Sequence, residues 1–442
     1  MLLPQTSVRT DFSSLISDDA WSFREVKRPE TNYISHSYHR YPAKFIPQIV
    51  NRLILNFTDQ GDLVLDPFGG CGTTLVESKV LGRKSIGFDI NPVAKLITET
   101  KITPIKPISL DNYLNKFINT YNQQKSKDIS IVHSNRINYW FDPSVQTQLD
   151  RIFLSINRIK DHKVKRFFLC AFSHVLKNCS RWLMKSIKPQ VDPNKIPPDI
   201  LKTFLIHIHH MMVKNLEFYE LLKSSGNLKT QTNMKLRDST KRFPLKNNSI
   251  DLIITSPPYV TSYEYADLHQ LILLWLGDDP VSYSRWNKYA REYQSFKGKF
   301  VGTKLAEHNN YDQSLGSTAN YIISQLPNNR KYAKSVAKYF SDTKKSIAQM
   351  YQVLKPGRKV CIIIGNTTLS GTEIKNAEVT AEQMQEAGFI IKNVIKRELS
   401  NKMITSWRDK ISGRFTNTDS AQKMRVYEHE FVIIGEKPLL PN

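Results

Sequence analysis

The chain has 442 residues, of which 63 are lysine or arginine and 40 are aspartate or glutamate, so its formal net charge is +23. With 40% hydrophobic and 10% aromatic residues it can form a sizeable core, which excludes wholesale disorder. Such an excess of positive charge favours a polyanionic partner, nucleic acid before a membrane surface. An unspecialised basic surface is the alternative.

The cysteines and the apolar runs narrow the class of protein further. The four cysteines, at positions 71, 170, 179 and 361, form no Cys-x-x-Cys pair and have no histidines at ligand spacing. Neither a disulfide framework nor a metal site is therefore expected. The longest apolar run, near residues 271–276, is far short of the ~20 residues that span a bilayer, and the first residues do not resemble a signal peptide. We expect a cytoplasmic protein with no membrane segment.

The first third of the chain predicts an arm followed by a βαβ unit. Residues 1–34 are polar and irregular, and we interpret them as an N-terminal arm. Within residues 35–103, apolar residues at helical spacing predict helices over 46–57 and 73–81. Short apolar runs at 62–66 and 84–90 predict buried strands. This part is expected to bind a cofactor.

A helical insertion is predicted over residues 104–230. Apolar residues recur at helical spacing over 142–156, 167–183 and 200–222, and bases outnumber acids throughout the segment. The basic surplus is consistent with a groove that recognises DNA, although solvated helix faces explain much of it.

Strand signals resume in residues 231–442, at 234–236, 250–254, 358–364, 389–395 and 429–434, with helices expected over 332–354 and 376–387. Strands that alternate with helices predict an α/β fold with a doubly wound, Rossmann-like and mostly parallel sheet. No helix separates the last two strands, which therefore favours an antiparallel hairpin at the sheet edge.

A second insertion, near residues 278–330, is predicted as a basic loop. It interleaves bases with aromatic residues, namely Arg285, Lys288, Arg291, Lys297, Lys299 and Lys304 with Tyr283, Trp286, Tyr289, Tyr293 and Phe296. This mixture suits phosphate contact and base stacking, while a solvated surface loop is an equally good interpretation. A third basic stretch lies between the last two strands, with Lys402, Arg408, Lys410, Arg414, Lys423 and Arg425.

The first motif with chemical content is DPFGGCGTT, residues 66–74, between the first strand and its helix. Its glycines allow close approach of the backbone to a ligand, and the helix N-terminus offers free N–H groups to an anion. Asp89 ends the second strand, where a carboxylate can accept hydrogen bonds from ribose hydroxyls. Together they predict a nucleoside-bearing cofactor. A tight turn without a ligand is the alternative.

The second motif is TSPPY, residues 255–259, at the carboxyl end of another strand. Its prolines fix the backbone, so the Ser256 side chain and the Pro257 carbonyl can present two acceptors, and Tyr259 offers an aromatic face. Two acceptors suit an exocyclic amine, because they direct the nitrogen lone pair at a methyl sulfonium. The alternative is a Pro-Pro loop that only turns the chain.

These motifs, DPFGGCGTT, GFDINP and TSPPY, together resemble the amino-methyltransferase family of DNA methylases, which use S-adenosylmethionine. The HRYPAKF stretch, residues 39–45, is similar to the segment that the family places before its cofactor motif. The resemblance assigns the methionine end of the cofactor to the glycine motif, the ribose to Asp89 and the adenine amine to Asp238. It assigns the target base to Ser256, Pro257, Pro258 and Tyr259. The cofactor residues it implies are Lys44, Phe45, Asp66, Phe68, Gly69, Gly70, Gly72, Thr73, Asp89 and Asp238.

The resemblance implies a methyltransferase with a Rossmann-like sheet that modifies a flipped base in double-stranded DNA. The SPPY form leans toward cytosine N4, and adenine N6 is the alternative; an RNA guanine-N2 enzyme and a silent DNA-binding subunit are further alternatives. C5 methylation of cytosine is not indicated, because the family that performs it presents its thiolate in a Pro-Cys pair and no cysteine here follows a proline. A restriction-modification or defence setting is expected, and the sequence leaves open whether a cognate nuclease accompanies the enzyme.

Overall fold

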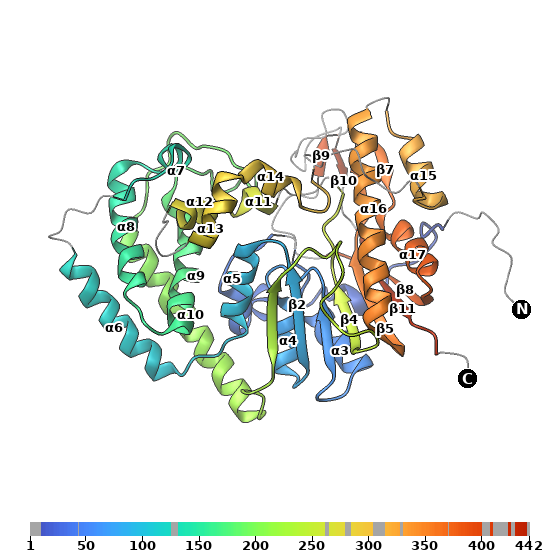
Figure 1. Cartoon of the computed structure of the whole chain (residues 1–442), viewed down its shortest axis with the longest axis horizontal. Coiled ribbons are helices and arrows are strands. Elements are labelled where there is room, and N and C mark those ends of the chain that lie inside the picture. Colours follow the sequence, from blue (N-terminus) through green and yellow to red (C-terminus); the bar gives the residue numbers. More distant parts are fainter. Residues whose placement is uncertain are drawn as a thin grey trace, which may run out of the picture.

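The computed structural model describes residues 10–42, 44–124, 131–260, 265–278, 284–303, 314–327, 330–369, 371–399, 407–409, 423–425 and 429–439. At its centre lies a seven-stranded sheet in the order β3-β2-β1-β4-β5-β11-β8 (Figure 1). Its strands are β1 (Leu63–Asp66), β2 (Lys84–Asp89), β3 (Thr232–Leu236), β4 (Ile250–Thr255), β5 (Leu354–Ile364), β8 (Ile390–Glu398) and β11 (His429–Glu436).

The sheet is parallel from β3 through β5, and β11 runs antiparallel to both of its neighbours, β5 and β8. The predicted doubly wound α/β fold and the antiparallel pairing of the last two predicted strands are confirmed. The later strand of that pair, β11, does not form the edge, because it lies between β5 and β8.

Helices cover both faces of the sheet, as the alternation of side chains along each strand requires. On one face, α3 (Pro47–Phe57) packs its apolar side against Val64 of β1, and α4 (Thr73–Val80) lies beside α3. On the other face, Leu65 joins the core formed with α16 (Arg330–Val353) and α17 (Asn376–Glu386).

A helical lobe lies beside the sheet, next to α5 (Pro92–Lys101) (Figure 1). Its helices are α6 (Pro107–Gln123), α7 (Asn135–Trp140), α8 (Pro143–Asn157), α9 (His162–Cys179) and α10 (Ile200–Ser224). They share one apolar cluster, which includes the fully buried Phe117, Phe153 and Phe168. The predicted helical character of residues 104–230 is confirmed, while the division of the chain into domains stays a prediction.

The prediction of a basic loop near residues 278–330 is wrong in its conformation. The structure has α11 (Tyr265–Leu268), α12 (Gln270–Asp278), α13 (Ser284–Arg291), α14 (Tyr293–Gly298) and α15 (Ser317–Ser324) in or next to this segment. Tyr293 and Phe296 are only 4% and 3% exposed, because they join the apolar cluster of the helical lobe. In this arrangement they are not free to stack on bases. Tyr283 and Lys304 lie outside the described residues, as do Lys402, Lys410 and Arg414 of the last basic stretch.

Short elements complete the fold. Two small antiparallel sheets pair β6 (Thr367–Leu369) with β7 (Thr372–Ile374), and β9 (Trp407–Asp409) with β10 (Lys423–Arg425). The predicted arm, from residue 10 onward, contains α1 (Asp19–Ser22), α2 (Arg28–Thr31) and a 3₁₀ turn, η1 (Ile34–Ser37). It docks along β8, where the Asp18 N–H donates to the Lys396 carbonyl at 2.8 Å. None of the helices described has the length and apolar character needed to cross a membrane.

Candidate active site

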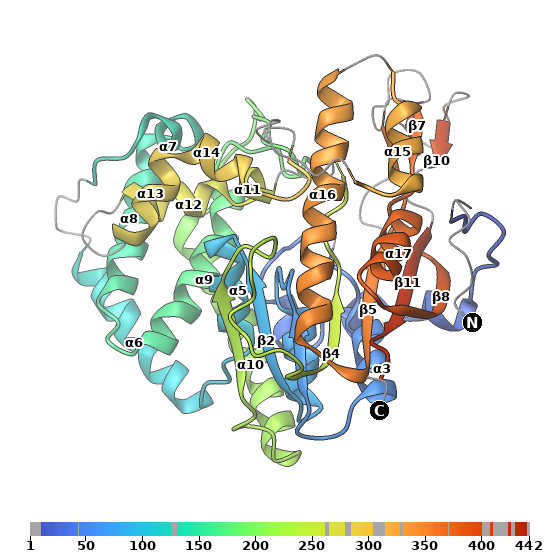
Figure 2. The same ribbon diagram turned by 45° about the vertical axis from the view of Figure 1, so that its right-hand side comes forward.

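A cavity at the carboxyl ends of β1, β2, β3 and β4 brings the two sequence motifs together. Figure 2 shows this edge of the sheet between the helical lobe and α16. Of the predicted site residues, the cavity is lined by Lys44, Phe45, Phe68, Gly69, Gly70, Thr73, Asp89, Asp238, Ser256 and Pro258. The other four, Asp66, Gly72, Pro257 and Tyr259, do not line it.

Asp66 does not line the cavity, but its hydrogen bonds connect the two motifs. Its Oδ1 accepts hydrogen bonds from the Thr255 hydroxyl at 2.7 Å and from the Phe68 N–H at 3.1 Å. Burial raises the pKa of this carboxyl to about 6, and those hydrogen bonds oppose the shift. Since Thr255 immediately precedes Ser256, this contact fixes the start of the second motif relative to the first. The structure therefore gives Asp66 a positioning contact within the protein.

Gly72 is the N-cap of α4, and its backbone lies in the left-handed region with φ of 80°. A Cβ there would lie 2.5 Å from Cγ2 of Thr98 on α5, so glycine is required for packing as well as for conformation. Thr98 also donates its hydroxyl hydrogen to the Gly70 carbonyl at 2.8 Å. These contacts fix the glycine turn, and Gly69, Gly70 and Thr73, the first residue of α4, line the cavity.

Asp89 lines the cavity at the end of β2. Its two carboxylate oxygens accept hydrogen bonds from the Gly70 N–H at 3.0 Å and the Asn91 N–H at 2.7 Å. Burial raises the pKa of this carboxyl to about 6, and the negative charge of Asp66 adds to the shift. Each oxygen keeps acceptor capacity beyond these bonds, so the carboxylate can bind hydroxyl donors in the cavity.

Asp238 and Lys44 add one charge of each sign to the cavity wall. Asp238 Oδ1 accepts from the N–H and the hydroxyl of Thr240, at 2.9 and 2.8 Å, which leaves its other oxygen for a ligand. Lys44 Nζ donates to the Asn32 side chain at 3.1 Å and to the His36 carbonyl at 3.2 Å. Burial lowers the pKa of Lys44 to about 8, and the nearby charge of Lys101 adds to this effect.

The second motif turns its residues to different sides of the chain. Ser256 and Pro258 line the cavity, whereas Pro257 is buried. Tyr259 packs against the core under α16, and its hydroxyl donates to Glu430 Oε1 at 3.0 Å. Ser256 is therefore the side chain of this motif that offers a hydroxyl to a molecule in the cavity.

Sequence reasoning missed part of the cavity wall. The additional residues are Tyr41, Pro67, Cys71, Ile90, Arg237, Ser239, Tyr265, Lys299, Phe300 and Val301. Tyr41 belongs to the HRYPAKF stretch, and Arg237 and Ser239 flank Asp238, so their positions next to predicted residues were a usable signal. Tyr265 stacks on Tyr41 with ring centroids 6.1 Å apart, a contact between segments far apart in the sequence that no local pattern indicates.

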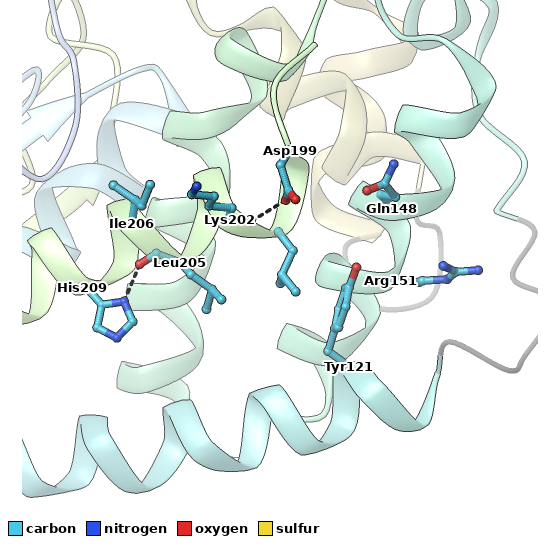
Figure 3. A pocket seen from close by; sticks show the side chains of 9 residues that line it. Tyr121, Gln148, Arg151, Asp199, Lys202, Leu205, Ile206 and His209 are labelled. Carbon is cyan, nitrogen blue, oxygen red and sulfur yellow. Dashed lines mark hydrogen bonds between the residues drawn. The ribbon is translucent and has the colours of Figure 1, made fainter.

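A second hollow lies in the helical lobe, between α6, α8 and α10 (Figure 3). It is lined by Tyr121, Gln148, Arg151, Asp199, Leu201, Lys202, Leu205, Ile206 and His209. Asp199 Oδ1 caps α10 by accepting from the Lys202 N–H at 2.8 Å, and His209 Nδ1 donates to the Leu205 carbonyl at 2.6 Å. None of its lining residues belongs to either motif, so we place the active site in the cavity at the sheet edge.

The sequence profile of a known family, described as DNA methylase, matches residues 8–100 and 250–434, which together are more than half of the chain. The chain belongs to the DNA methylase family. The stretch between the two matched segments contains the helical lobe and β3.

Two relatives match the DNA methylase over most of their length. The Type II methyltransferase M.MvaI of Kocuria varians is 26% identical over 405 residues, which cover 85% of this chain and 86% of that protein. The Type II methyltransferase M.BsoBI of Geobacillus stearothermophilus is 24% identical, covering 81% and 79%. Among solved structures, a SAM-dependent methyltransferase from Methanosarcina mazei is 10% identical, with a TM-score of 0.31 and coverage of 91% and 100%.

Proposed function

We propose that this DNA methylase methylates the N4 amine of cytosine in double-stranded DNA. The observation that carries the proposal is that one cavity contains both the glycine turn with Asp89 and the Ser256 side chain. A cofactor on the first and a base at the second would thus meet inside it. The methyl donor is S-adenosylmethionine, which supplies an activated methyl group on a sulfonium when it is bound.

The residues of the cavity fit the three parts of this cofactor. The N–H groups at the start of α4 and the ammonium of Lys44 suit the carboxylate of its methionine end. The Asp89 carboxylate suits the two ribose hydroxyls, and the free oxygen of Asp238 suits the adenine amine. With these three assignments, the residues of the cavity would hold the methionine end, the ribose and the adenine of the cofactor separately.

The target base would enter beside the second motif after leaving the DNA stack, which costs a few kcal/mol. The Ser256 hydroxyl oxygen, which belongs to the cavity wall, would accept a hydrogen bond from one N–H group of its amine. This orientation would direct the nitrogen lone pair at the methyl group that the bound cofactor supplies, with the nitrogen–carbon bond forming as the sulfur–carbon bond breaks and S-adenosylhomocysteine as the leaving group. The methylated amine would release its extra proton to water, and no covalent bond to the enzyme would be needed.

The alternative target within the same family is the N6 amine of adenine, which presents the same pair of N–H donors. The serine in the second motif supports cytosine. The resemblance to Type II methyltransferases supports a restriction-modification setting, in which a cognate nuclease is expected.

The experiment is to incubate the protein with methyl-labelled S-adenosylmethionine and unmethylated plasmid DNA, then digest the DNA and identify the labelled nucleoside. We expect N4-methylcytosine, and a Ser256→Ala variant serves as the matched control. Detection of N6-methyladenine would show that adenine, the alternative target, is the base that is methylated. A parallel incubation uses RNA as the substrate, and label in the RNA with none in the duplex DNA would overturn the proposal.

A further inference from the structure

Tyr259 of the second motif is held by a contact from a distant part of the sheet. Its hydroxyl donates to Glu430 Oε1 on β11 at 3.0 Å, although the two residues are 171 positions apart. Burial and the adjacent Glu430 carboxylate raise the pKa of the Tyr259 phenol well above its usual value, so the group remains a hydrogen-bond donor. The orientation of the ring is therefore coupled to the position of Glu430.

Two glycines lie close to Tyr259, one beside its ring and one beside its backbone carbonyl. A Cβ added to Gly365, just after β5, would lie 3.3 Å from the Tyr259 hydroxyl and 3.4 Å from its Cε2. A Cβ added to Gly302 would lie 2.9 Å from the Tyr259 carbonyl oxygen. The distances of 2.9 and 3.3 Å are shorter than ordinary van der Waals contact, so a side chain at either glycine would crowd Tyr259.

Glu430 is in turn fixed by a buried ion pair. Arg397 Nη1 of β8 lies 2.6 Å from Glu430 Oε2, and the two side chains are 3% and 12% exposed. Arg397 also donates from Nε to the Trp21 carbonyl at 2.8 Å, and its Nη2 lies 3.5 Å from the Ser22 carbonyl. The N-terminal segment thus anchors the arginine, the arginine anchors the glutamate and the glutamate anchors the tyrosine.

We propose that Glu430 and Arg397 are positioning residues for methyl transfer, acting through Tyr259. This inference rests on the proposed function, in which the second motif receives the flipped base. A base can be oriented by this motif only if the loop has one conformation, and the hydrogen bond to Glu430 selects that conformation. The role is distinct from binding the cofactor, because neither Glu430 nor Arg397 lines the cavity.

The test is a double-mutant cycle on the single-turnover rate of methyl transfer to unmethylated plasmid DNA. Tyr259→Phe deletes the hydroxyl and keeps the ring, and Glu430→Gln keeps the shape and removes the charge that holds Arg397. We expect each variant to slow transfer by roughly tenfold, as the loss of one hydrogen bond to a charged group implies. The double variant should be no slower than the slower single variant, because both changes break the same coupling.

Further measurements separate this role from a general loss of structure. The dissociation constant of S-adenosylmethionine should stay unchanged in all three variants, whereas a disturbed fold would weaken it. Arg397→Lys, which keeps the charge, should retain more activity than Arg397→Met. Glu436→Gln is the matched control, since Glu436 lies on the same strand and pairs with Lys359 away from Tyr259, and it should have the wild-type rate.

The outcomes distinguish this inference from the proposed function. Wild-type protein that transfers no methyl group to DNA would contradict the proposed function itself. An active wild type whose Tyr259→Phe and Glu430→Gln variants match its rate, or whose effects multiply independently, would overturn the positioning role alone.

Discussion

At the scale of single residues, two buried carboxylates organise the cavity. Asp66 and Asp89 end neighbouring strands, and burial raises the pKa of each carboxyl to about 6. Asp66 accepts its hydrogen bonds from the protein, whereas Asp89 also faces the cavity. Burial therefore raises the pKa of both carboxyls. The two differ in their contacts, since Asp66 positions the second motif and Asp89 can bind a ligand.

The raised pKa of Asp89 predicts a pH dependence of cofactor binding. Ribose hydroxyls donate to the carboxylate, so the acceptor weakens as the group protonates, and a group with a pKa of about 6 loses most of its charge between pH 7 and pH 5. Affinity for S-adenosylmethionine should fall several-fold over this interval when measured by calorimetry. Asp89→Asn should bind more weakly at pH 7 and show a flatter profile. Parallel pH profiles for the two proteins would contradict the assignment.

Ser256 predicts a defect in chemistry without a defect in binding. Ser256→Ala removes one acceptor for the target amine, and this contact should strengthen in the transition state. The single-turnover rate of methyl transfer should fall by about 10²–10³-fold. Affinities for cofactor and DNA should change little, as measured by calorimetry and by titration of labelled duplex. A wild-type rate in the folded variant would remove Ser256 from the reaction.

The sequence predicted the residues of the cavity that belong to local motifs. The glycine turn, Asp89 and Ser256 follow buried strands directly, and the carboxyl ends of parallel strands meet at one edge of a sheet. Tyr265 on α11 and Phe300 just after α14 escaped prediction, because their positions at the cavity depend on how these helices pack in the whole fold. Tyr259 illustrates a further limit, since its partner Glu430 is brought to it by strand order and not by any sequence spacing.

At the scale of elements, the helices that follow the second motif are packed on the helical lobe. His133 joins them, because its Nε2 lies 2.9 Å from Asp150 Oδ1 on α8 and its Nδ1 lies 3.6 Å from Asp278 Oδ2 on α12. Burial on its own lowers the pKa of His133, but hydrogen bonds and charge from the two aspartates outweigh it and raise the pKa to about 9. The imidazolium thus links α12 to the lobe at neutral pH.

This link predicts that stability falls in alkaline solution. The pKa of His133 is higher in the folded state than its usual value of 6.5, so its contribution is complete below pH 6.5 and is lost as pH rises through about 9. The contribution is on the order of 2–3 kcal/mol in the free energy of unfolding. Denaturant titrations of the wild type at pH 6 and pH 9.5 should show the loss. His133→Gln should remove that part of the pH dependence, and an unaltered difference would contradict the link.

The elements themselves were predictable to different degrees. Strands such as β1 and β4 are short apolar runs between turn residues, and both were found at the predicted positions. Helices α13 and α14 were predicted as a loop, because their many basic residues obscure the few apolar positions, such as Tyr293 and Phe296, that bury one face. The lobe that receives that face is distant in sequence, so the local pattern gave no reason to bury it.

At the scale of the whole molecule, the net charge and the position of the cavity both bear on the binding of a polyanion. The chain has a net charge of +23. The helical lobe and α16 flank the edge of the sheet that contains the cavity (Figure 2). An electropositive protein attracts a polyanion over a long range, and this attraction is screened by salt.

Binding to duplex DNA should therefore weaken steeply with salt. Each phosphate contact that releases a counterion contributes a slope of about −0.9 to the plot of log affinity against log salt concentration. Fluorescence anisotropy with a labelled duplex, between 50 and 200 mM salt, measures this slope. A flat plot would contradict a polyanionic partner, and Ser256→Ala should give the same slope as the wild type because it alters no charge.

The place of β11 in the sheet sets the order in which the molecule can be assembled during translation. The ribosome makes β5 and β8 first, yet both must wait for β11, whose residues from Phe431 to Glu436 pair with each of them. Until then a nascent chain exposes two unpaired strand edges, and the guanidinium of Arg397 lacks its carboxylate partner. A chain interrupted before residue 429 would keep its cofactor motif but present those edges to other chains. Translation must therefore continue through β11 before these edges can pair, and a shorter chain would be prone to aggregate.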